Sequence, residues 1–93
     1  MTVGILTVSI MISESNSLKD KRQVVRSLVE TLRQRFNVSV AEVGEQNSWR
    51  HAIIGVTCVS GDGSVADAVL NKIMDHIRSN PRVEVTDMQM EFV

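Results

Sequence analysis

The chain has 93 residues, which suits one domain, because two cores of half this length would each bury too little apolar surface to offset chain entropy. Hydrophobic residues make up 43% of it and charged residues 23%, and the net charge is −1. This composition is typical of a globular protein and excludes binding of nucleic acid or membranes through bulk charge. Any such binding must come from a local cluster, so we expect a single domain over residues 1–93 and examine its parts.

The cysteine, histidine and N-terminal patterns bear on compartment and cofactors. The only cysteine, Cys58, has no partner for an internal disulfide, which is typical of a cytoplasmic protein, and we expect it to be buried. His51 and His76 fall on different elements without ligand spacing, so no metal or other cofactor is expected. The apolar run from Val3 to Ile12 is too short to span a membrane and predicts a strand, with no membrane partner.

The first half of the chain predicts a strand and a long helix. Residues 2–13 alternate, with one parity apolar throughout and the other mixed, which favours a central strand. Residues 17–36 predict an amphipathic helix with Ser17 as N-cap and Asp20 three positions later. Asn37 is expected to end this helix in the left-handed conformation.

The second half predicts a hairpin, a helix and a last strand. Residues 38–45 are shorter and more polar and indicate an edge strand, whereas residues 49–60 are apolar on both parities and indicate a central one. Ser64 is expected to cap a second helix that ends before Asn80-Pro81. Residues 82–93 change their apolar phase near Thr86-Asp87, which predicts a β-bulge.

The order of these elements is βαββαβ. Right-handed crossovers place both helices on one face of a four-stranded antiparallel sheet, so we expect an α+β, ferredoxin-like fold. The other face would then be open and would carry more apolar side chains than a small monomer normally exposes. The residues expected there are Val3, Ile5, Met11, Ile53 and Val59.

The first predicted helix concentrates positive charge. Six of the ten Lys and Arg residues and two of the eleven acidic residues lie between positions 17 and 36, so this stretch carries +4 and the remainder −5. On a helical wheel four cations share one strip beside the apolar face, and Lys21 and Arg35 fall on the opposite flank. The four are Lys19, Arg22, Arg26 and Arg33. They are the candidate nucleic-acid or anion-binding residues.

Two interpretations of this strip remain open. Long cationic side chains can simply cover the apolar rim of a helix while their charged groups stay solvated. Alternatively the strip binds an anion, above all the phosphate backbone of RNA, for which arginine offers bidentate contacts without base specificity. Lone Trp49 does not give the aromatic pair by which similar sheets stack bases. Glu42 and Glu45 would fit acid–base roles, but an exposed edge and turn explain them better.

The segment SLKDKRQVVRSLVETLRQRFNVSVAEVGEQNSWRHAIIGV resembles the signature region of the YlxP-like family, a bacterial domain family of unknown function. The resemblance covers residues 4–59 well and the remainder mainly in pattern. It implies a ferredoxin-like fold and supplies no activity and no site residues. Members are often encoded beside translation-initiation and ribosome-maturation proteins, which implies by association a role near RNA or ribosome assembly.

These observations predict a small cytoplasmic binding protein rather than an enzyme. Its expected partner is RNA or a ribosomal particle, bound through the strip on the first helix. The alternative is a homodimeric regulatory or scaffolding module that uses the open sheet face and holds a small ligand, as ACT-like domains do.

Overall fold

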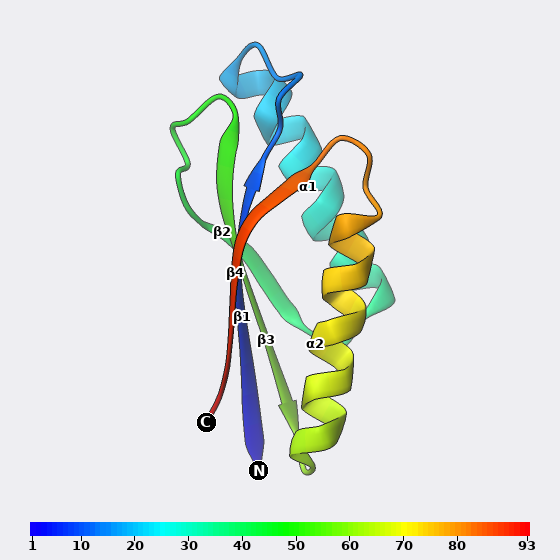
Figure 1. The fold of residues 1–93 in the computed structure, drawn as a ribbon. Helices are drawn as coiled ribbons and strands as arrows, with labels where there is room; N and C mark the ends of the chain where they lie inside the picture. Colours follow the sequence, from blue (N-terminus) through cyan, green and yellow to red (C-terminus); the bar gives the residue numbers. More distant parts are fainter.

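The computed structural model describes residues 1–93 and confirms the expected element order and architecture. The elements are β1 (Thr2–Met11), α1 (Leu18–Arg35), β2 (Ser39–Gly44), β3 (His51–Ser60), α2 (Gly63–Arg78) and β4 (Glu84–Phe92). The strands form one antiparallel sheet in the order β2-β3-β1-β4, so β1 and β3 are central, as their apolar parities predict. Both helices lie on the same side of the sheet (Figure 1). This is the α+β, ferredoxin-like fold.

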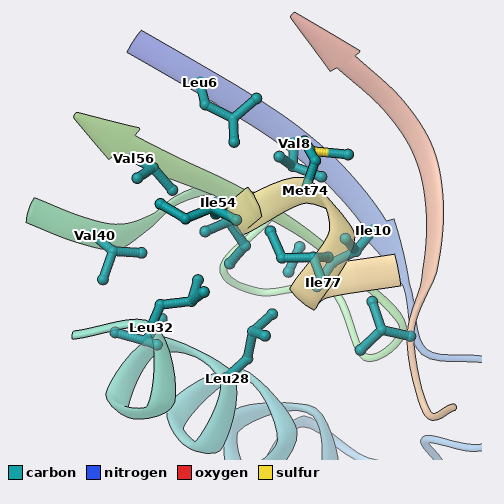
Figure 2. Packing of buried hydrophobic residues seen from close by; sticks show 14 of the residues in the cluster. Leu6, Val8, Ile10, Leu28, Leu32, Val40, Ile54, Val56, Met74 and Ile77 are labelled. Atoms are coloured by element: carbon teal, nitrogen blue, oxygen red, sulfur yellow. The ribbon is translucent and has the colours of Figure 1, made fainter. Parts of the chain in front are cut away.

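The hydrophobic core lies between the sheet and the two helices. Alternate residues of β1 and β3 point toward the helices, and Figure 2 shows them meeting side chains of β2, α1 and α2. Those labelled there are Leu6, Val8, Ile10, Leu28, Leu32, Val40, Ile54, Val56, Met74 and Ile77. Cys58 is buried at the edge of the same core, as expected. Neither helix is long and apolar enough to cross a membrane.

Helix α1 begins as predicted and ends differently. The hydroxyl of Ser17 accepts a hydrogen bond from the main-chain NH of Asp20 at 3.0 Å, and the Asp20 carboxylate accepts one from the NH of Asn16 at 3.1 Å. The expected left-handed Asn37 is wrong, because Phe36 leaves the helix directly in an extended conformation with φ −131°. Phe36 thereby packs against the core and the edge of the His76 ring, so burial of the aromatic side chain decides how the helix ends.

Helix α2 is capped by Asp62, two residues before the expected Ser64. The Asp62 carboxylate accepts hydrogen bonds from both the hydroxyl and the main-chain NH of Ser64, at 2.8 and 2.9 Å. Ser64 therefore donates to the cap and lies inside the helix, which begins at Gly63. Asp is as good an N-cap as Ser, and here it is the residue that stands at the chain reversal.

The Asp62 cap predicts an acid-sensitive contribution to stability. The hydrogen bond from the Ser64 hydroxyl, followed by that from the Ser64 NH, lowers the pKa of Asp62 below its ordinary 3.8. Because the folded-state pKa is depressed, the stabilisation is full above pH 3.8 and is lost as pH falls through the lower value. We expect a carboxyl-carbon NMR titration to find this pKa below 3.8, and Asp62→Asn to weaken the acid dependence of unfolding. An ordinary pKa would contradict the cap.

The predicted bulge in β4 is confirmed at Thr86. Ser9 of β1 pairs with Asp87 while its neighbour Ile10 pairs with Val85, so Thr86 is the extra residue. Its hydroxyl donates to the main-chain oxygen of Ser9 at 3.1 Å. The extra residue moves the side chains after it to the opposite face of β4. Val85, Met88 and Met90 therefore all pack against the core.

Candidate anion-binding site on helix α1

Three of the four predicted cations lie around one shallow depression on α1. Lys19, Arg22 and Arg26, together with Gln23, form its whole lining, without an acidic or apolar residue. All four side chains are exposed. The depression occupies the solvent side of the first half of the helix, as the spacing of three, four and seven positions requires.

None of these three cations is neutralised within the protein. The structure contains a single ion pair, between Lys21 and Glu42, although acidic residues outnumber basic ones. Glu30 lies four positions after Arg26, the spacing at which opposite charges on a helix meet, and still forms no ion pair. The positive charge of the depression is therefore available to a ligand.

Arg33, the fourth predicted cation, is separated from the other three. Its guanidinium donates to the main-chain oxygen of Val40 in β2 at 2.9 Å. It also does not line the depression formed by Lys19, Arg22, Gln23 and Arg26. The strip therefore divides into a group of three free cations and an arginine that connects α1 to the sheet.

The wheel placed Lys21 on the flank opposite the cationic strip, and this is wrong. Lys21 is completely buried on the core side of α1. Its ammonium group contacts the Glu42 carboxylate at 2.7 Å and donates to the main-chain oxygens of Glu45 at 2.9 Å and Gln46 at 3.2 Å. All three donor hydrogens are thus used. The interpretation of Glu42 as an exposed edge residue is also wrong, because it is the counter-ion of this lysine.

The buried lysine fixes the turn between β2 and β3. Because Lys21 holds the Glu45 oxygen, Glu45 adopts the left-handed conformation with φ 58°, the only residue of the chain with positive φ. Arg50 completes the attachment by donating from Nε to the main-chain oxygen of Ser15 at 2.9 Å. The turn and the loop before α1 are therefore joined at one end of the molecule, the upper end in Figure 1. Trp49, at the end of this turn, is 60% exposed.

The burial of Lys21 has one signal in the sequence. Val24, Val25 and Leu28 follow it by three, four and seven positions, the spacing of residues on one helix face, and all three are buried. A lysine on the same helix face as these apolar residues is either buried with a carboxylate partner or extends its charged group to the solvent at the edge of that face. His51 is exposed and His76 packs against Phe36, and no three His, Cys, Asp or Glu side chains come close enough to hold a metal ion.

The fold and this site define a small α+β domain with an unpaired cationic patch. Residues 3–90 match the family described as "Protein of unknown function (DUF503)", and the chain belongs to that family. It is similar to the uncharacterized protein YlxP of Bacillus subtilis (strain 168), with 29% identity over 97% of this chain and 98% of YlxP. The YlxP-like resemblance is thereby confirmed.

One solved structure shows a more distant likeness. A REP-associated tyrosine transposase bound to a REP hairpin matches with a TM-score of 0.44 and 16% identity, over 98% of this chain and 55% of the other. The chain spans about half the length of that protein. A likeness of this size carries no argument about function.

Proposed function

We propose that this protein is a non-enzymatic RNA-binding protein that contacts phosphate groups through Lys19, Arg22 and Arg26. The observation that supports this most directly is the depression on α1, which these three cations line without an acid or an internal ion pair. Two arginines and a lysine within two helical turns offer several charge-assisted hydrogen bonds to neighbouring phosphates. Such contacts position a nucleic acid without reading its bases.

The amino end of α1 adds to this potential. Lys19 and Arg22 lie in the first turns of the helix, where the aligned peptide dipoles contribute further positive charge. The acid of the first turn, Asp20, is engaged by the NH of Asn16. Ribosomal RNA in the cytoplasm is the partner to test first, because of the genomic association implied by the YlxP-like resemblance.

The salt dependence of binding tests the proposal. Fluorescence anisotropy with a labelled single-stranded ribosomal RNA fragment should be recorded between about 50 and 300 mM KCl, over which the Debye length falls from about 14 to about 6 Å. Three phosphate contacts predict a slope of about −2 in a plot of log affinity against log salt, at ~0.7 per contact. Failure to bind at 50 mM, or affinity independent of salt, would contradict phosphate contact by this patch.

A second candidate is the homodimeric module on the open sheet face. It is supported by Val59 and Val43, which are 67% and 59% exposed on or beside that face. Sedimentation velocity at micromolar protein distinguishes the two, because a dimer through the sheet predicts a species of about twice the 10.3 kDa chain mass. The acidic side chains of the same face, Glu84, Asp87 and Glu91, oppose this pairing.

A further inference from the structure

The central strands carry apolar side chains on both faces of the sheet, but the helices cover only one face. In β1 and β3 the helix-facing parity is apolar along almost its whole length, and the other parity mixes apolar with polar residues, which is more apolar than a fully solvated strand face requires. The helices cover one face of the sheet, and the other has no layer upon it (Figure 1). The register places apolar residues in neighbouring positions of this open face. They are Val3, Ile5, Met11, Ile53 and Val59, as the sequence predicted.

β2 adds to the apolar centre through a second bulge. Glu42 pairs with Ile54 and Gly44 with Ile53, so Val43 is the extra residue of β2. A side chain at Gly55 would come within 3.1 Å of the Val43 methyl group, which shows that Val43 lies over this glycine on the open face. The absence of a Cβ at Gly55 thus extends a smooth apolar surface across three strands.

Every formal charge of the open face is negative. None of the four strands contains a lysine or an arginine, and all ten cations belong to the helices and the loops around them. Of the strand acids, Glu42 faces the helices and pairs with Lys21. The other three follow β4 opposite Met11, Ser9 and Ile5 of β1 and are exposed. They are Glu84, Asp87 and Glu91.

A hollow marks the end of this face near the β2–β3 turn. It is lined by Ser9, Ile10, Glu45, His51, Ala52, Ile53 and Thr86, and its volume is about 300 Å³. This is the lower limit for small-molecule pockets, so the hollow suits one side chain better than a cofactor. Its acid is Glu45, whose left-handed backbone is held by buried Lys21. The hollow therefore offers a carboxylate and two hydroxyl-bearing residues to a cationic side chain.

We propose that the open sheet face binds a basic amphipathic helix of another protein. An apolar stripe on that helix would cover Ile5, Ile53 and Val59, and its flanking lysines or arginines would meet the β4 acids and the Glu45 hollow. A helix of 18 residues is about 27 Å long, close to the ~33 Å of a ten-residue strand. The two-layer fold would then become a three-layer one with both sheet faces covered.

The charges favour such a partner over a second copy of this chain. Two open faces in contact would bring six β4 carboxylates and two Glu45 carboxylates together without a lysine or arginine, since each copy brings three and one. The chain's own basic helix cannot serve, because the apolar side of α1 is already buried in the core. The face is complementary to a surface that is both apolar and cationic, and the α1 patch, which has no apolar residue in its lining, is not such a surface.

NMR titration with a designed helical peptide tests this directly. The peptide has 18 residues, with leucine at helical spacings of three and four and lysine elsewhere; its control has glutamate in place of lysine. The lysine peptide should shift amide signals of Ile5, Ile53 and Val59 and leave those of Arg22 and Arg26 unchanged. Absence of shifts, shifts confined to α1, or equal binding of the glutamate peptide would overturn the proposal.

Matched charge variants complete the test. Glu84→Gln/Asp87→Asn/Glu91→Gln should weaken binding of the lysine peptide about tenfold, the effect of losing three exposed ion pairs. Glu30→Gln/Asp67→Asn/Asp75→Asn removes the same charge from exposed positions of the helix layer and should change it less than about twofold. Equal losses in both variants would overturn the assignment to β4. The proposal is independent of RNA binding, which neither triple variant of these acids should weaken.

Discussion

Replacing Lys21 by alanine should lower the free energy of unfolding by about 3 kcal/mol. Removing one partner of a buried ion pair costs roughly 3–5 kcal/mol, because the other charge remains without compensation. The lower end applies here, since the side chain of Glu42 keeps 16% of its exposure. The oxygens of Glu45 and Gln46 lose their donor as well. Against a total stability of about 5–15 kcal/mol, this is a large fraction.

Urea denaturation followed by circular dichroism measures the loss, and thermal unfolding should show a midpoint lower by about 12–24 °C, at ~4–8 °C per kcal/mol for a domain of this size. Lys19→Ala is the matched control, because Lys19 precedes Lys21 by two positions and is exposed without an ion pair. Its effect should stay within about 0.5 kcal/mol. A Lys21 variant as stable as the Lys19 variant would contradict the role of the buried pair.

A double variant separates the ion pair from the turn. In Lys21→Met/Glu42→Leu both charges are replaced by apolar groups, which is often neutral for a buried pair alone. Here the two turn oxygens would still lack the donor that the ammonium provides. We therefore expect the double variant to remain less stable than the wild type by about 1–3 kcal/mol, the cost of unsatisfied buried acceptors. Full recovery would show that Lys21 serves Glu42 only.

The fold was predictable because its signals are local and periodic. Alternation in β1 and β3 identified the two central strands, and the change of phase at Thr86 identified the bulge. The turn conformations were less predictable. Asn37 has the higher left-handed propensity, but Glu45 adopts that conformation, because Lys21 binds its main-chain oxygen from 24 positions away. Hydrogen bonds between residues so far apart in the chain cannot be predicted from the hydrophobic periodicity of a single element.

The part of the candidate site that lies on one helix could be predicted from the sequence, and the contacts between that helix and the sheet could not. Lys19, Arg22 and Arg26 come together because helix geometry alone brings residues three, four and seven apart to one side. Arg33 lies on the same side of the helical wheel, but a wheel does not show contacts with other elements. The main-chain oxygen of Val40 that accepts its hydrogen bond belongs to β2. The ion pair of Lys21 could not be predicted for the same reason, because its partner Glu42 lies on β2, 21 positions away.

The positive charges of α1 and the negative charges of the strands lie in different layers of the structure, although the net charge is only −1. The free cations face outward from α1, and the free strand acids face outward from the opposite side of the sheet. An anion on one side and a cationic helix on the other can therefore bind together without competing. Variants that reverse charge in one layer should leave binding at the other layer intact.

Reversing the charge of the α1 patch should abolish most RNA affinity. In Arg22→Glu/Arg26→Glu two of the three proposed phosphate contacts are lost, so the salt slope should become shallower by about 1.4. The same relation gives an affinity lower by at least ~60-fold at 0.05 M salt and ~14-fold at 0.15 M. Both arginines are exposed and form no ion pair, so the variant should fold with the stability of the wild type.

The matched control is Lys72→Glu/Arg78→Glu, which makes the same change of net charge on exposed positions of α2. If bulk charge governed the affinity, the two double variants would lose it equally, because a change of four charges acts on any polyanion at long range. If the patch governs it, the α2 variant should lose less than about threefold and keep the wild-type slope. Equal losses would therefore contradict the patch even if the wild-type slope were steep, and the difference between the two variants is the quantity that decides.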